Sequence, residues 1–196
     1  KSSAMFPVIC GAGISVTLSF LNYWKYKNGN WDVSCLVTLR KQNGDAIKRS
    51  YFKIDKDVYS LKLLDFLGES LDENGMFIGS CELEFHSTED LKYPYPAVTL
   101  FYETAKGVSA VHVASRVFQS TKDMDLRLMS DVAESGFDIH SDEILTPFFC
   151  FTNGPRSVAD AKIVFRAFNI LGEEKTIETR LAPLQPYETV FFFPVP

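Results

Sequence analysis

Strict alternation of apolar and polar residues runs through most of this chain. It is clearest in 14–20 (ISVTLSF), 31–39 (WDVSCLVTL) and 58–64 (VYSLKLL), and it returns in 76–86 and 158–168. Successive side chains of a β-strand point to opposite faces of a sheet, so this period of two predicts strands with one buried face. Aromatic residues, which favour strands, make up 14% of the chain, and convincing helical periodicity is scarce. We therefore expect an all-β protein.

Turn residues separate these segments. An Asn-Gly pair at Asn43 and Gly44 favours a tight hairpin between 31–39 and 46–54, and a second hairpin is expected around Gly172. Further strands are predicted at 97–102, 109–117, 145–152 and 175–181, and another near the C-terminal end. Many short strands joined by turns predict antiparallel β-sandwich units of immunoglobulin-like size.

Charge divides the chain into two parts. Residues 120–143 are crowded with acidic side chains, and the whole net charge of −5 lies in 119–196, since 1–118 is neutral. Such a run is typical of a solvated connector, and its spacing does not fit a calcium-binding loop. We predict a first sandwich unit at 1–118, and an acidic connector followed by a second unit at 119–196.

The two parts show matching patterns. When Gly44 is superimposed on Gly172, Cys35 falls on Ile163 and Tyr59 on Tyr187, so that buried positions match buried positions. A strand that ends near an asparagine precedes each match, at Asn22 and at Asn153. The pattern indicates two related units, consistent with an internal duplication.

Several of these segments resemble a known family. They are Asn153, Gly172, 181–189 (LAPLQPYET), Gly79 with Phe85 and Ser87, 96–98 (PAV), and 110–112 (AVH) with Arg116. Their order resembles the small β-sandwich family of soluble sensory-rhodopsin transducers, although the segments come from both halves of the chain. The resemblance implies a non-enzymatic binding or signalling module that oligomerises, so we expect a homo-oligomer.

Residues 10–15 (CGAGIS) are similar to the nucleotide loop that opens the NAD-dependent protein deacylases. Phosphate binding by such a loop requires a helix after the glycines, so that backbone N–H groups at its N-terminus face the pyrophosphate. Here a strand-like segment, VTLSF, follows directly, and neither a second glycine-rich segment nor a zinc-binding cysteine set is present in the sequence. We therefore predict a tight turn or bulge that links two strands.

No catalytic residues or cofactor are predicted. The sequence has no GxSxG elbow, and its cysteines, which show no paired spacing, are expected to be buried free thiols: Cys10, Cys35, Cys81 and Cys150. A metal-assisted hydrolase that uses Glu84, His86 and His112 is an alternative, because imidazole and carboxylate ligate zinc. None of the three is paired at a ligand spacing, so no metal site is predicted.

Two groups of residues are candidates for binding. His112, Ser115 and Arg116 are polar positions near the end of the otherwise apolar 109–117 strand, and an arginine fork suits a carboxylate or a diol. Tyr23, Trp24 and Trp31 lie among lysines and asparagines in 22–31, where rings suit stacking on a sugar or a protein. A purely structural role is the alternative for each group. The polar residues would then anchor the end of the strand, and the rings would cover one end of the core.

The sequence thus predicts a non-catalytic module that binds a small ligand, such as a carbohydrate, or a protein partner. A purely structural subunit of a larger assembly is the further alternative. A net charge of −5 argues against nucleic acid, and the longest apolar stretches fall well short of the roughly 20 residues that span a membrane. The opening KSSAMFPVIC lacks the apolar core of a signal peptide, which predicts a cytoplasmic protein unless an export signal has been removed.

Overall fold

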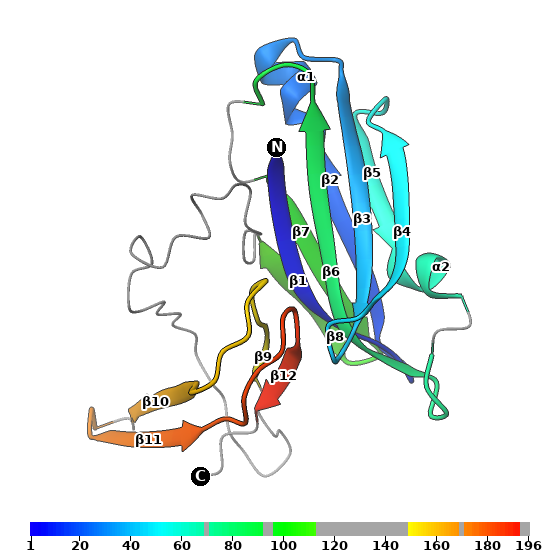
Figure 1. Cartoon of the computed structure of the whole chain (residues 1–196). Helices are drawn as coiled ribbons and strands as arrows, with labels where there is room; N and C mark the ends of the chain where they lie inside the picture. The colour runs from blue at the N-terminus through cyan, green and yellow to red at the C-terminus, as the bar shows by residue number, and fades with distance from the viewer. Residues whose placement is uncertain (69–70, 92–95, 113–148, 169–170, 193–196) are drawn as a thin grey trace.

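The computed structural model describes residues 1–68, 71–91, 96–112, 149–168 and 171–192 (Figure 1). The chain is all-β, as predicted, and every strand pairing among these residues is antiparallel. Its elements are β1 (Ser2–Gly11), β2 (Ser15–Leu21), α1 (Tyr23–Asn28), β3 (Val33–Lys41), β4 (Ala46–Lys53), β5 (Val58–Lys62), α2 (Leu63–Leu67), β6 (Met76–Ser87), β7 (Val98–Thr104), β8 (Gly107–His112), β9 (Phe149–Thr152), β10 (Lys162–Phe168), β11 (Glu174–Arg180) and β12 (Thr189–Phe192).

Residues 1–112 form a sandwich of two four-stranded sheets. Sheet A has the strand order β1-β6-β3-β4, and sheet B has the order β5-β2-β7-β8. Figure 1 shows sheet A in front of sheet B, with α1 over one end of the sandwich. The alternating apolar side chains point between the sheets and form the core, which includes Phe6, Val8, Val16, Leu18, Val37, Leu39, Leu83, Phe85, Val98 and Leu100. Burying each of these large side chains contributes about 1.5–3 kcal/mol to folding.

The 10–15 segment is a tight turn between two strands, as predicted. Gly11 and Ile14 exchange backbone hydrogen bonds of 2.9 and 3.0 Å, and Ala12 and Gly13 between them both have positive φ. Positive φ at both central residues defines the type I′ turn of a two-residue hairpin. The strand before the turn is β1 of sheet A, and the strand after it is β2 of sheet B. The turn therefore connects the two sheets.

The structure has a short helix, α1, within 22–31, where the sequence predicts no helix. The Asn22 side chain caps the helix by accepting a hydrogen bond of 3.2 Å from the Lys25 backbone N–H, and Gly29 ends it with a φ of 65°. Trp24 is the buried residue of the helix, and its ring lies 4.7 Å from that of Phe85 in the core. Neither of the short helices in the described part of the chain has the length or apolar character needed to cross a membrane.

The second part contains two separate strand pairs, β9 with β12 and β10 with β11. The pair β9 and β12 corresponds in chain order to β2 and β5, and the pair β10 and β11 corresponds to β3 and β4. In β12, however, the residue that corresponds to a given residue of β5 lies three positions later than in the sequence superposition. Asn153 donates its backbone N–H to Glu188, just as Asn22 donates to Asp57, so that Val190 rather than Tyr187 corresponds to Tyr59. The duplication remains a prediction, and the acidic 120–143 segment lies outside the described residues.

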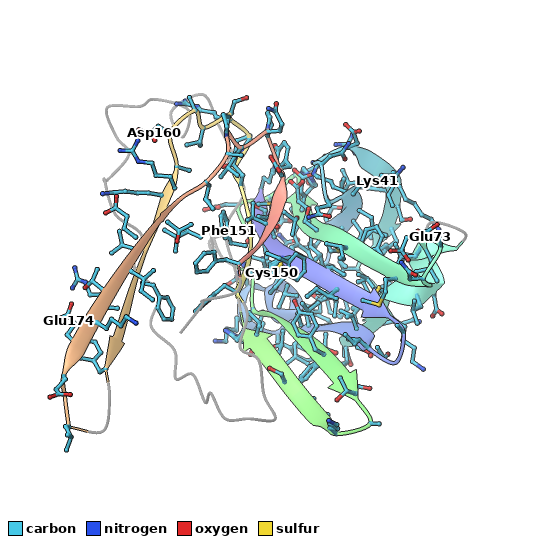
Figure 2. The ribbon with its side chains drawn as sticks, turned by 90° about the horizontal axis from the view of Figure 1, so that it is seen from below. Lys41, Glu73, Cys150, Phe151, Asp160 and Glu174 are labelled. Atoms are coloured by element: carbon cyan, nitrogen blue, oxygen red, sulfur yellow. The ribbon has the colours of Figure 1, made fainter. Side chains whose placement is uncertain are left out.

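The second part is attached to the sandwich at the β3–β4 turn. The Thr189 backbone N–H donates to the Gln42 carbonyl over 2.8 Å, and the Tyr187 ring lies 4.0 Å from the Arg40 guanidinium. Figure 2 shows Cys150 and Phe151 of β9 between the β10–β11 hairpin and the sandwich. Gly44 makes this approach possible, because a Cβ atom there would overlap the carbonyl oxygen of Pro186.

We predict that Gly44→Ala destabilises this attachment more than Gly172→Ala destabilises the other hairpin. Both glycines have positive φ (91° and 78°), so each substitution costs about 1–2 kcal/mol of backbone strain. Only Gly44 also faces Pro186, which adds about 1–3 kcal/mol of steric overlap. Urea unfolding of the two variants measures the difference, and equal losses would contradict it.

Candidate functional site

A hollow of about 300 Å³ lies on the outer face of sheet B, beside α1. Its lining comes from all four strands of the sheet and from the first residue of the helix. The residues that shape it are Ser19, Leu21, Tyr23, Thr99, Phe101 and His112, with Val58 at the β5 side. This is the strongest candidate for a ligand site in the described part of the protein.

A row of polar side chains crosses the floor of the hollow. Ser19 of β2 is directly opposite Thr99 of β7, and Thr99 is directly opposite His112 of β8. Residues paired in this way have Cβ atoms about 4.5–5.5 Å apart and point to the same face. Two hydroxyls and an imidazole therefore lie side by side, and each can both donate and accept hydrogen bonds.

Apolar and aromatic side chains flank this row. Leu21 and Phe101 lie two residues along their strands from Ser19 and Thr99, so they share the outer face. Tyr23 closes the α1 side, and the Lys27 ammonium lies 5.1 Å from its ring centre. Among the residues that the structure describes, the lining of the hollow contains no Asp, Glu, Lys or Arg side chain. The hollow therefore suits an uncharged ligand that has both polar and apolar surface.

The structure brings together two of the predicted binding residues, His112 and Tyr23, and places Trp24 and Trp31 outside the lining of the hollow. Trp24 is only 3% exposed and packs in the core, so its ring does not reach the surface. Trp31 is 63% exposed and is not part of the lining. Ser115 and Arg116 lie outside the described residues.

Trp31 belongs to an exposed cluster beside the start of β5. The Lys25 ammonium lies 4.5 Å from the Trp31 ring centre and 5.4 Å from that of Tyr26, and it donates a hydrogen bond of 2.5 Å to Asp57. This hydrogen bond is the main cause of a raised pKa at Lys25 and of a lowered pKa at Asp57. Asp57 directly precedes Val58, so the cluster adjoins the hollow.

The three residues of the metal-hydrolase alternative do not form a site. Glu84 and His86 alternate with the core residues Leu83 and Phe85, so they point to the outer face of sheet A, whereas His112 lies on the outer face of sheet B. Two packed sheets are about 10 Å apart, which keeps these side chains on opposite sides of the sandwich. Glu84 forms an ion pair with Lys1, and burial is the main cause of the lowered pKa of His86. Among the described residues, no three His, Cys, Asp or Glu side chains gather closely enough to hold a metal.

The cysteines are free, as predicted, and poorly suited to nucleophilic chemistry. Cys10, Cys35 and Cys81 are buried, and Cys150 is partly buried. Burial raises the pKa of Cys10 to about 11 and that of Cys150 to about 12, and it also raises the pKa values of Cys35 and Cys81. A thiol with such a pKa contains very little of the nucleophilic thiolate at neutral pH.

The outer face of sheet A carries a buried ion pair instead of an open site. Arg40 Nη2 lies 2.7 Å from Glu82 Oε2, both side chains are at most 10% exposed, and Tyr187 covers the guanidinium. Burial is the main cause of the raised pKa of Glu82, and the hydrogen bond from Arg40 opposes it. Alternation places both residues on the outer face of their strands, but it does not show that a later segment of the chain covers that face.

Sequence reasoning also missed Ser19 and Thr99. Alternation places both residues on the outer face of their strands, but serine and threonine are common there and give no further signal. Only the register of β2, β7 and β8 shows that they lie next to His112. Family models, curated proteins and solved structures show no match to this chain. The resemblance to sensory-rhodopsin transducers therefore remains an expectation.

We predict that Arg40→Ala destabilises the fold by about 3–5 kcal/mol, because it leaves Glu82 buried without its partner. The loss should be smaller at pH 5 than at pH 8. Since the pKa of Glu82 is higher in the folded protein than in the unfolded chain, the folded variant binds a proton first and gains stability as the pH falls.

Urea unfolding of the variant and the wild type at several pH values tests this expectation. Arg49→Ala, which removes an exposed arginine from the neighbouring strand β4, is the matched control and should change the unfolding free energy little. If the two variants lose the same unfolding free energy, or if the loss for Arg40→Ala does not depend on pH, Arg40 and Glu82 do not form a stabilising buried ion pair.

Proposed function

We propose that this protein is a non-catalytic β-sandwich module that binds a hydroxyl-rich, uncharged ligand of the saccharide class in the hollow of sheet B. The observation that carries the proposal is the row of Ser19, Thr99 and His112 between aromatic side chains. Sugars present hydroxyl groups around their edge and apolar C–H groups on their faces. Adjacent hydroxyl and imidazole groups match the edge, and Tyr23 and Phe101 match the faces.

The size and charge of the hollow support this ligand class. A volume of about 300 Å³ is at the lower end of the range for small-molecule sites, so it suits one ring rather than a large cofactor. The described part of the lining has no charged side chain to select a phosphate or a carboxylate. The hollow is shallow and open, which suits one residue of a longer chain that continues into solvent.

The test is a thermal-shift screen of mono- and oligosaccharides, followed by titration of the best ligand. A ligand that binds only the folded state stabilises it by about 2.7 kcal/mol at 100 times its Kd. At about 2–4 °C per kcal/mol for a chain of this size, the unfolding midpoint should rise by about 5–10 °C.

We predict that His112→Ala and Thr99→Val each weaken this ligand at least about tenfold, since each removes one hydrogen-bonding partner without changing the core. Both variants should unfold near the wild-type temperature in the absence of ligand. His86→Ala is the matched control, because it removes a histidine from the outer face of sheet A. If it weakens binding as much as His112→Ala does, the ligand does not bind in the hollow.

A protein partner is the second candidate, and the exposed cluster around Lys25 favours it. Trp31 and Tyr26 are 63% and 61% exposed, and Lys25 holds both rings beside Asp57. Exposed tryptophan, tyrosine and charged groups in one patch are typical of the energetic centre of an interface. This surface adjoins the hollow, so one partner carrying a saccharide could contact both.

We predict that Trp31→Ala leaves the stability of the isolated protein within about 1 kcal/mol, because only an exposed cation–π contact is lost. It should reduce the recovery of a specific partner, measured by quantitative mass spectrometry with the variant and the wild type as baits. Tyr51→Ala removes a ring that is 68% exposed on β4 and serves as the control. Equal recovery with all three baits would exclude the Lys25 cluster as the contact surface.

A further inference from the structure

The edges of the sandwich differ in how they are protected from pairing with another strand. Natural edge strands usually carry charged residues or proline, because an open edge presents unpaired backbone groups. β1 contains Pro7, whose carbonyl accepts a hydrogen bond of 2.7 Å from the Tyr102 hydroxyl. β4 carries Lys48 and Arg49, and the short β5 ends at Lys62. Three of the four edges are therefore protected.

The fourth edge strand, β8, has neither proline nor a fixed charge. Its sequence is GVSAVH, and all six of its residues are exposed. Val108 is 66% exposed and Val111 is 39% exposed, although they point to opposite faces of the sheet. Among the strands described, β8 pairs only with β7. An apolar, uncharged edge of this kind is suited to accept another strand.

The β7–β8 turn shows which backbone groups of β8 point away from β7. Thr104 and Gly107 are partners on either side of a two-residue turn, and such flanking residues form a hydrogen-bonded pair. Alternate residues of β8, beginning with Gly107, therefore direct their N–H and C=O groups toward β7. The residues between them, Val108, Ala110 and His112, direct theirs toward the open edge.

We propose that two copies of this chain pair through their β8 strands, antiparallel, about a two-fold axis at Ala110. In this register Ala110 pairs with Ala110 of the second copy, and Val108 pairs with His112 of the second copy. The three outward-directed residues of each strand are then all used, which forms six backbone hydrogen bonds. Sheet B continues across the axis into the sheet of the second copy.

A second copy fits this edge for three reasons. A two-fold axis places Ala110 opposite its own copy, where a fixed charge would meet a like charge, and β8 has no fixed charge. The small side chain at the axis, Ala110, leaves space for its own copy. Val108 would contact the imidazole that lines the hollow, so the second copy would extend the open side of that hollow. The pairing itself does not depend on the identity of the ligand.

The test uses opposite charges at the axis. Ala110→Lys places two ammonium groups directly opposite each other, and Ala110→Glu does the same with carboxylates, so each variant alone should be a monomer. An equimolar mixture should form a heterodimer, since the two charges then attract. The wild type should be a dimer, as measured by analytical ultracentrifugation over a range of concentrations at low salt.

Ser60→Lys is the matched control, because it adds a charge to the exposed outer face of β5, at the other edge of the same sheet. This variant should remain a dimer. Circular dichroism verifies that each variant is folded. If a variant is unfolded, the oligomeric state of the wild type still tests the proposal. A monomeric wild type, dimeric single variants, or a mixture that stays monomeric would each overturn the proposal.

Discussion

The contact of Phe85 with Phe20 and Trp24 holds sheet B and helix α1 in place beside the hollow that we propose as the binding site. Phe85 belongs to sheet A and is fully buried, and its ring lies 5.1 Å from that of Phe20 in sheet B and 4.7 Å from that of Trp24 in α1. The same contact therefore joins the two sheets and holds a helix of only six residues, which is far too short to be stable alone. Because Trp24 anchors the helix, its neighbours Tyr23 and Lys25 are held at the surface beside the hollow.

Alternation predicts which side of a strand a residue occupies, but it does not predict which strands are neighbours. It correctly places Phe20, Val98 and Leu100 in the core, and so it places Ser19 and Thr99 on the outer face. The polar row exists only because β2 pairs with β7, and these strands are far apart in the sequence. His112 could be noticed beforehand because it is the imidazole of an otherwise apolar strand. Long-range register is a property of the whole sheet, and a period of two contains no information about it.

The errors have similar physical causes. Helix α1 has fewer than two turns, so it shows no measurable period, and its only signals are a capping asparagine and a terminating glycine that also occur in turns. The polar neighbours of Trp24 left open whether its ring binds a partner or covers the core, and the structure places it in the core. The sequence superposition matched Tyr187 with Tyr59, yet Tyr59 is a buried strand residue, whereas Tyr187 has a φ of 60° and covers Arg40 before β12 begins. The superposition aligned two tyrosines, although one lies in a strand and the other has a left-handed backbone conformation.

The two outer faces of the sandwich also explain why the hollow lies where it does. On sheet A, Tyr187 covers the Arg40–Glu82 ion pair, and a buried pair of charges is tolerated only if both partners stay together. That face is committed to holding the second part of the chain. The outer face of sheet B carries hydroxyls, an imidazole and rings, which tolerate exposure to water and lose little when a polar ligand replaces that water. The attachment and the proposed binding site thus lie on opposite faces, so that a ligand in the hollow would not disturb the contacts that hold the two parts together.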